Sequence, residues 1–295
     1  MLNRLLRRTT VLITAGLLAG AGLAGPATAR PHAMPAASEH ATGWYLALGD
    51  SLAAGYQPGA GDDKDGGYVG QVLDAVQDDH PKTKLRNLAC SGETTVTLVD
   101  GGRCTYPQGS QLDQATQFLK AHARTARLVT LTIGANDVQR CVSRSASGIS
   151  VNQPCIAAGM GDVAALLPQA LTDLRQAAPD AEIIVTNYYN PFLAAWLTGP
   201  AGEDLAKSTV ALQATLNTII AAAAAAAGAA TADLAAAFAS DDFTPVSAQP
   251  IGFPGELPRS VLNICAWTWM CSKTDIHAND AGYAVIAGAV AAKLS

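Results

Sequence analysis

Four residues of this sequence have the types that acyl transfer requires: Ser51, Gly92, Asn136 and His277. A serine hydroxyl becomes an effective nucleophile when a histidine takes its proton. The oxyanion that then forms needs preorganised N–H donors. We therefore expect Ser51 to attack and His277 to act first as base and then as acid. The oxyanion hole is expected to consist of the backbone N–H groups of Ser51 and Gly92 and the side-chain amide of Asn136.

These residues follow elements that would bring them together. Short apolar runs alternate with helical stretches, and this alternation predicts a parallel sheet covered on both faces. Ligands of such sheets bind beyond the carboxyl ends of the strands. The expected strands are Tyr45–Leu48, Lys84–Ala89, Leu128–Ile133, Glu182–Thr186 and a weaker run at Thr231–Leu234. The expected helices are Val69–Gln77, Leu112–Ala123, Val163–Ala177, Asp204–Ala227 and Ala281–Leu294.

Each of the four residues also has an ordinary structural explanation. Ser51 could cap a helix, Gly92 could allow a positive φ, Asn136 could be a turn residue and His277 could be a surface histidine. Their expected location favours a catalytic role over these explanations. Three of the residues follow predicted strands at one edge of the sheet, and His277 precedes the last predicted helix.

The motifs around these residues resemble the SGNH, or GDSL-type, hydrolase family. Ser51 lies in G-D-S-L, Asn136 in G-A-N-D, and His277 begins H-x-N-x-x-G-Y, so the resemblance runs from Leu46 to Ala287. It implies a three-layer α/β/α fold with a central parallel sheet of about five strands. It also implies hydrolysis of esters or thioesters without a metal cofactor. The α/β-hydrolase fold would instead want G-x-S-x-G, but Ala53 occupies the place of the second glycine.

One position departs from the family pattern, in which an aspartate precedes the histidine as D-x-x-H. Thr274 stands at that position, and the nearest acid is Asp275, two residues before His277. Either Asp275 reaches the imidazole by a different turn, or the backbone carbonyl of Thr274 orients the ring. A carboxylate would stabilise the imidazolium more strongly than a carbonyl. We expect Asp275 to be the third catalytic residue.

The amino-terminal segment has the three regions of a secretory signal peptide. A basic start, M-L-N-R-L-L-R-R, precedes an apolar run and the cleavage motif Ala27-Thr28-Ala29. We expect a signal peptide over residues 1–29, a flexible lead-in over 30–42, and one hydrolase domain over 43–295 of a secreted protein. A membrane anchor is the alternative, but small residues dilute the apolar run.

Net charge and cysteine content further limit the partners and the kinds of site that this sequence can have. Cleavage after Ala29 leaves 16 basic and 24 acidic side chains, a net charge of −8, which argues against a nucleic-acid partner. The six cysteines of an exported chain predict disulfides. Their sequence-local spacing favours the pairs Cys90–Cys104, Cys141–Cys155 and Cys265–Cys271. A zinc site is the alternative, but C-x-x-C is absent from the sequence.

The predicted function is a secreted lipase or esterase that cleaves small-molecule or lipid acyl esters. We expect a monomer with no cofactor, no stable membrane span and no nucleic-acid partner. A polysaccharide deacetylase of the same fold and a non-catalytic binding module remain as alternatives. Trp267 and Trp269, in the Cys265–Cys271 loop, could either pack beneath that loop or form an apolar wall for an acyl chain.

Overall fold

The computed structural model describes residues 42–145 and 148–295. Its central sheet has five strands in the order β2-β1-β3-β6-β7, and every neighbouring pair runs parallel. The strands are β1 (Trp44–Gly49), β2 (Lys84–Asn87), β3 (Ala126–Thr132), β6 (Glu182–Thr186) and β7 (Ala230–Ala232). The predicted five-stranded parallel sheet is therefore confirmed.

Burial on both faces explains why the central strands are continuously apolar. Four consecutive residues of β1, Tyr45 to Leu48, have no exposed surface. The neighbouring strand β3 pairs with β1 on one side and with β6 on the other. An alternating strand would place polar side chains against one of the two helical layers.

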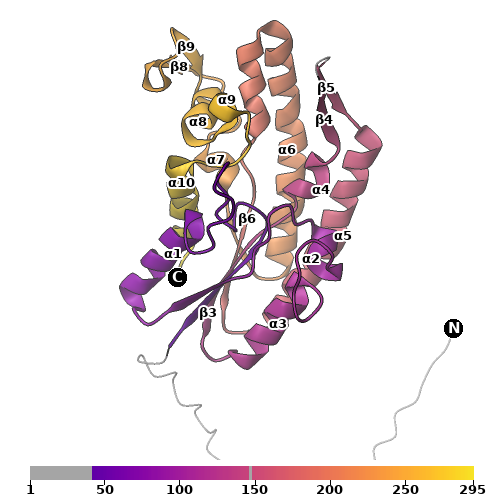
Figure 1. The fold of residues 1–295 in the computed structure, drawn as a ribbon, viewed down its shortest axis with the longest axis vertical. Helices are drawn as coiled ribbons and strands as arrows, with labels where there is room; N and C mark the ends of the chain where they lie inside the picture. The colour runs from indigo at the N-terminus through magenta and orange to yellow at the C-terminus, as the bar shows by residue number, and fades with distance from the viewer. Residues whose placement is uncertain (1–41, 146–147) are drawn as a thin grey trace, which may run out of the picture. The chain divides into compact units, whose positions relative to one another are not determined.

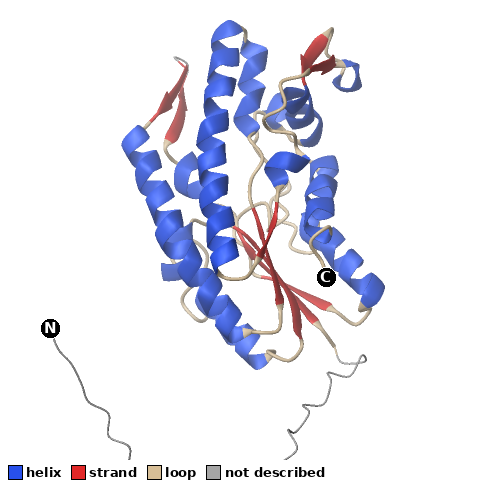
Figure 2. Ribbon diagram, turned by 180° about the vertical axis from the view of Figure 1, so that it is seen from behind, coloured by secondary structure: helices blue, strands red, loops and turns tan. Residues whose placement is uncertain are grey.

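Helices cover both faces of the sheet (Figures 1 and 2). On one face α1 packs against α10, and on the other α5 contacts both α3 and α6. The helices are α1 (Gly67–Asp79), α2 (Thr95–Asp100), α3 (Gln111–Ala121), α4 (Ala135–Gln139), α5 (Gln153–Ala177), α6 (Pro200–Ala226), α7 (Leu234–Ala237), α8 (Arg259–Trp267), α9 (Met270–Lys273) and α10 (Asp280–Ala291), with the 3-10 helices η1 (Pro191–Thr198) and η2 (Gln249–Ile251). The three-layer α/β/α architecture follows from this arrangement.

Side-chain caps fix where two of these helices begin. Ser110 Oγ accepts the N–H of Asp113 at 3.0 Å and starts α3. Asn279 Oδ1 accepts the N–H of Gly282 at 3.0 Å and starts α10, two residues after His277. Each cap satisfies a backbone donor that has no partner within the helix.

The structure corrects three of the predicted boundaries. Helix α5 begins at Gln153, ten residues before the predicted start, because Asn152 caps it and Pro154 is tolerated in the first turn. Helix α6 likewise begins at Pro200 rather than Asp204. The predicted strand Thr231–Leu234 is shorter, since β7 ends at Ala232 and Leu234 already opens α7.

Two hairpins and several short helices were not predicted. The hairpins are β4 (Val142–Ser145) with β5 (Gly148–Val151), and β8 (Pro245–Ser247) with β9 (Glu256–Pro258). By length and composition, α5 and α6 could also cross a membrane. In this fold they pack against each other beside the sheet. The predicted signal peptide, and all but the last residue of the lead-in, lie outside the described residues.

Candidate active site

Ser51 lies in a tight turn directly after β1. The turn begins at Gly49, whose φ of +121° favours glycine over residues with a side chain. A Cβ at this position would also clash with the carbonyl oxygen of Thr132 on β3. The N–H of Asp50 donates to that same carbonyl at 2.9 Å. The turn leaves Ser51 9 % exposed, so its hydroxyl lies at the carboxyl edge of the sheet.

The structure brings His277 to Ser51 from 226 residues away in the sequence. His277 Nε2 lies 2.7 Å from Ser51 Oγ, and His277 Nδ1 lies 2.7 Å from Asp275 Oδ1. A carboxylate only accepts hydrogen bonds, so Nδ1 carries the ring proton and donates it to Asp275. The lone pair of Nε2 is then free to accept the hydroxyl proton of Ser51.

A local turn allows Asp275 to work from only two residues before the histidine. Its Oδ1 accepts the backbone N–H of His277 at 2.9 Å as well as the ring N–H. This is the self-bonding turn that aspartate forms with the N–H two residues ahead. Thr274, at the usual position of the family acid, adopts a left-handed conformation with φ +56°. Of the two partners considered for the imidazole, the Asp275 carboxylate is the one within hydrogen-bond distance.

The loop that carries His277 is fastened to the preceding disulfide loop. The N–H of Trp269 donates to the carbonyl of His277 at 3.0 Å, and the N–H of Asn279 donates to the carbonyl of Trp267 at 3.0 Å. The side chain of Trp267 packs edge-on against Phe238 with ring centroids 5.3 Å apart. Trp269 Nε1 donates to Gln57 Oε1 at 2.5 Å. Both tryptophans therefore have structural contacts that fit the packing alternative.

Gly92 lies in the turn after β2, where its φ is +82°. A Cβ at this position would clash with the guanidinium of Arg103. The Nε of Arg103 donates to the neighbouring carbonyl of Ser91 at 2.9 Å. The positive φ selects glycine here, whereas the exposed side chain of Arg103 could move away from a Cβ. The positive φ does not require an oxyanion role.

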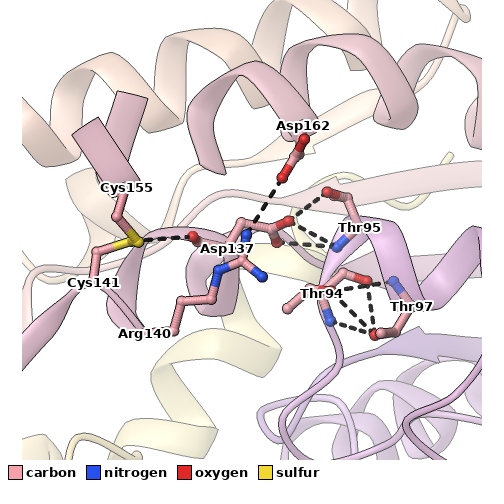
Figure 3. Close-up of polar contacts among 8 residues, drawn as sticks. All are labelled: Thr94, Thr95, Thr97, Asp137, Arg140, Cys141, Cys155 and Asp162. Atoms are coloured by element: carbon pink, nitrogen blue, oxygen red, sulfur yellow. Dashed lines mark hydrogen bonds and ion pairs between the residues drawn. A yellow bond between two sulfur atoms is a disulfide. The ribbon is translucent and has the colours of Figure 1, made fainter. Parts of the chain in front are cut away.

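Asn136 lies in the first turn of α4, after β3. Its Nδ2 donates one hydrogen to the carbonyl of Glu93 at 2.8 Å, and the amide has a second N–H. The adjacent Asp137 carboxylate accepts the Thr95 N–H at 3.0 and 3.1 Å and the Thr95 hydroxyl at 2.6 Å (Figure 3). Burial raises the pKa of Asp137, and the Thr95 hydrogen bonds oppose that rise. The two predicted oxyanion loops are thus bonded directly to each other.

Sequence reasoning missed Gln111, which links Ser51's strand to the Gly92 loop. Its Oε1 accepts the Gly49 N–H at 2.6 Å, and its Nε2 donates to the Gly49 carbonyl at 3.1 Å and to Glu93 Oε2 at 2.9 Å. Gln111 is fully buried. A glutamine one residue after a helix cap carries no sequence signal for this role.

A buried acid beside Ser51 was also missed. Asp50 Oδ2 accepts the hydroxyl of Tyr188 at 2.5 Å, and Asp50 Oδ1 accepts the N–H of Leu52 at 3.0 Å. Burial raises the pKa of Asp50 to about 7. The sequence did contain a signal for this pair of residues. Asp50 belongs to the G-D-S-L motif, and Tyr188 follows the strand β6.

The six cysteines form the three local pairs Cys90–Cys104, Cys141–Cys155 and Cys265–Cys271. The first closes the loop beside Gly92, and the third closes the loop before His277. Among residues 42–145 and 148–295, no group of three or more His, Cys, Asp or Glu side chains could hold a metal ion.

A small cavity of about 20 Å³ opens at the centre of these residues. Ser51, Asn136 and His277 line it, together with Gln139 and Tyr189. The ring of Tyr56 lies against the imidazole of His277, with centroids 4.4 Å apart. The side chains of Ser51, His277 and Asn136 therefore line one space.

Comparisons with known proteins identify the family and the fold of this chain. The profile of the GDSL-like Lipase/Acylhydrolase family matches residues 47–285. The lipase Lip_vut3 from a goat rumen metagenome is 16 % identical, with a TM-score of 0.52 over 86 % of this chain and 100 % of that chain. A putative GDSL-like lipase from Parabacteroides merdae is 14 % identical, with a TM-score of 0.51 over 86 % and 97 %. Both likenesses show the fold.

A third solved structure has higher sequence identity. The phospholipase A1 from Streptomyces albidoflavus NA297 is 25 % identical, with a TM-score of 0.43 over 68 % of this chain and 82 % of that chain. The curated proteins include no match to the chain. The family profile covers most of the sequence and includes the positions of Ser51, Gly92, Asn136 and His277. The chain therefore belongs to the GDSL-like lipase/acylhydrolase family, and it is an ester hydrolase.

Proposed function

We propose that this protein is a secreted carboxylic ester hydrolase, a lipase or esterase, that works through an acyl-enzyme intermediate on Ser51. The observation that carries the proposal is the hydrogen-bonded chain from Ser51 Oγ through His277 to Asp275, with both contacts at 2.7 Å. A nucleophile, a base and a group that orients the base are the arrangement that covalent catalysis by serine requires.

In the acylation step, His277 Nε2 takes the hydroxyl proton as Ser51 Oγ attacks the ester carbonyl carbon. The carbonyl π electrons move onto oxygen, and the imidazolium is stabilised by the Asp275 carboxylate. The oxyanion then collapses, the bond to the leaving alkoxide breaks, and His277 gives its proton to that alkoxide. The products of this step are the alcohol and acyl-Ser51.

Deacylation repeats the sequence with water. His277 Nε2 takes a proton from water, whose oxygen attacks the acyl carbonyl carbon. Collapse of the second oxyanion releases the carboxylic acid, and the proton on His277 returns to Ser51 Oγ. The histidine is thus base and then acid in each half-reaction.

The oxyanion in both steps is assigned three donors: the N–H groups of Ser51 and Gly92 and the side-chain amide of Asn136. The direct bond from Asn136 to the Glu93 carbonyl supports this assignment, because it ties the amide to the Gly92 loop. Donors held in place before the reaction need no reorganisation when charge develops.

Secretion, a single domain over residues 43–295 and a monomeric state are parts of the same proposal. The signal-peptide pattern of residues 1–29 supports export. The three disulfides support an oxidising destination, because such bonds persist outside the cytosol. Detection of the cleaved chain beginning at Arg30 in a culture medium would test this part.

A serine-directed fluorophosphonate and a short nitrophenyl ester test the mechanism. We expect the phosphonate to label Ser51, and Ser51→Ala and His277→Ala each to abolish turnover while the protein stays folded. The two losses should not add in the double variant, because the residues act as one unit. Ser208→Ala and His80→Ala, at exposed positions, are the matched controls.

Two outcomes would contradict the proposal. Turnover close to the unaltered level in either single variant would remove the Ser51–His277 mechanism. An unaltered protein that neither turns over any ester nor reacts with the phosphonate would instead favour a non-catalytic binding module.

A further inference from the structure

A mainly apolar groove of about 410 Å³ among the described residues has no role in the mechanism and contains none of the family motifs. Its walls come from η1, α6, α9 and the ends of the β4–β5 hairpin. Among the described residues that line it, no side chain carries a charge, and the lining includes Phe192, Ala195, Leu205, Leu212, Met270 and Thr274. Ligand pockets of small molecules commonly span about 300–1,000 Å³ and are mainly apolar.

Three stretches of chain run from the catalytic cavity directly into this groove. The segment after β6 lines the cavity at Tyr189 and Pro191, and continues as η1, which lines the groove. The segment from Met270 to Thr274 lines the groove and continues to His277 in the cavity. Helix α4 lines the cavity, and Val142, three residues beyond its end, lines the groove.

A third, small cavity adjoins both spaces. A cavity of about 30 Å³ shares Ala135 and Gln139 with the catalytic cavity, and shares Phe192 and Leu212 with the groove. A ligand that reaches from Ser51 past this small cavity into the groove must therefore be thin, and the part that lies in the groove must be apolar. An unbranched alkyl chain has that shape, whereas a sugar ring is bulky and carries polar groups that this lining would leave without partners.

We propose that this groove binds the alkyl chain of the substrate's acyl group, so that the enzyme prefers medium- or long-chain acyl esters to acetyl esters. The inference rests on the proposed function of Ser51. The other large cavity, about 310 Å³, is unsuited to this role, since it lies at the amino ends of the strands and is lined by charged residues that include Arg124, Arg127 and Asp180.

Burial of each methylene contributes about 0.8 kcal/mol, which corresponds to roughly a fourfold change in an equilibrium or rate ratio. For the unaltered enzyme we expect kcat/KM to rise by up to about that factor per methylene from acetyl to lauroyl nitrophenyl esters. Ala195→Trp fills the groove and should abolish the rise, so that the lauroyl and acetyl esters are hydrolysed with similar kcat/KM. Leu212→Asn, which keeps the branched shape and replaces apolar surface with an amide, should weaken the rise. Ala211→Trp on the exposed face of α6 is the matched control.

A binding measurement separates this proposal from that of catalysis. In Ser51→Ala, we expect laurate to bind with a negative change in heat capacity, and the added Ala195→Trp substitution to abolish binding. If the proposed catalysis by Ser51 were wrong, the protein would turn over no ester, but laurate would still bind in the groove. The groove assignment is overturned if Ser51-dependent turnover does not rise with chain length, if Ala195→Trp and Leu212→Asn both keep the profile of the unaltered enzyme, or if laurate does not bind.

Discussion

At the scale of single residues, the position of Asp275 shows how a short spacing can still orient the imidazole. The Asp275 carboxylate bends back over its own chain and accepts both the backbone and the ring N–H of His277. A carboxylate three residues earlier would need a longer turn. The left-handed Thr274 directs the chain into the shorter one, so the replacement of the usual aspartate does not by itself remove the acid.

Asp275→Asn tests whether this carboxylate acts in catalysis. The change keeps the shape of the side chain, removes the charge that stabilises the imidazolium and can hold the wrong tautomer, which can cost about 10⁴-fold in kcat. We expect a loss of that order at the pH optimum, with the thermal melting point as a check on folding. A drop below tenfold would leave a Ser51–His277 dyad oriented by the backbone.

A second prediction at the scale of single residues concerns Asp50. Burial raises the pKa of its carboxyl from 3.8 to about 7. Between these values the folded state holds a proton that the unfolded state releases. The free energy of unfolding therefore falls as pH rises through this window. The contribution of Asp50 is complete below about pH 4 and lost above about pH 7. Its full size is on the order of 4 kcal/mol.

Asp50→Asn should remove this dependence, since asparagine can accept the Leu52 N–H and donate to the Tyr188 hydroxyl. Urea unfolding from pH 4.5 to pH 8 would measure the effect, with the exposed Asp74→Asn as control. We expect the Asp50→Asn protein to gain stability relative to the unaltered protein as pH rises. If the free energies of unfolding of the two proteins changed in parallel with pH, the raised pKa of Asp50 would be contradicted.

At the scale of elements, hydrogen bonds between α2 and α4 join the two loops to which we assign oxyanion donors. Asp137, at the start of α4, accepts three hydrogen bonds from Thr95, at the start of α2. Thr94 caps α2 by accepting the Thr97 N–H at 3.1 Å. Each loop follows a different strand, so these bonds set the distance between Gly92 and Asn136.

Thr95→Val tests this connection, because it removes the hydroxyl and keeps the shape of the side chain. Losing one hydrogen bond to a charged group should cost about 1.5–3 kcal/mol of unfolding free energy. A displacement of the donors by about 1 Å can lower kcat by up to about a hundredfold, and KM should change less. Thr218→Val, exposed on α6, is the control. An unchanged kcat in a destabilised protein would restrict the Asp137–Thr95 bonds to stability.

The elements also show what the sequence could and could not predict. The central strands were predicted because burial on both faces leaves an unbroken apolar run. Short elements such as α9 and the β4–β5 hairpin were missed, since four residues carry too little periodicity. Ser51 and His277 were predicted from their motifs, and the structure places their side chains within hydrogen-bond distance. Gln111 was missed because its role depends on contacts with Gly49 and Glu93, which are distant in sequence.

At the scale of the whole molecule, the parallel sheet gathers the site along one edge and the disulfides fasten the loops beyond it. Ser51, Gly92 and Asn136 follow β1, β2 and β3 at their carboxyl ends, and His277 returns from the far end of the sequence. The groove combines four separate stretches of chain. A single sequence without structure does not place such stretches side by side, so packing and an apolar wall both remained open for Trp267 and Trp269, and Met270 was not considered.

Two of the disulfides form a matched pair that separates stability from catalysis. Cys90–Cys104 and Cys141–Cys155 have the same sequence separation of 14. In the chain-entropy model each contributes roughly 3 kcal/mol. They differ in position, because the first holds the segment whose Arg103 lies against Gly92. Loss of that bond should free the oxyanion loop.

We therefore expect Cys90→Ala/Cys104→Ala and Cys141→Ala/Cys155→Ala to lower the unfolding free energy by similar amounts. The first double variant should lower kcat on an acetyl ester more than the second, because Arg103 lies against Gly92. Cys141 reaches the site indirectly, through its contact with the Asp137 carbonyl of α4 (Figure 3). Urea unfolding and steady-state kinetics measured well below the unfolding midpoint would separate the two effects. If both double variants keep the kcat of the unaltered enzyme, the Cys90–Cys104 bond stabilises the fold without positioning Gly92. In that case the hydrogen bonds from Gln111 and Asn136 to Glu93 are sufficient to hold the oxyanion loop.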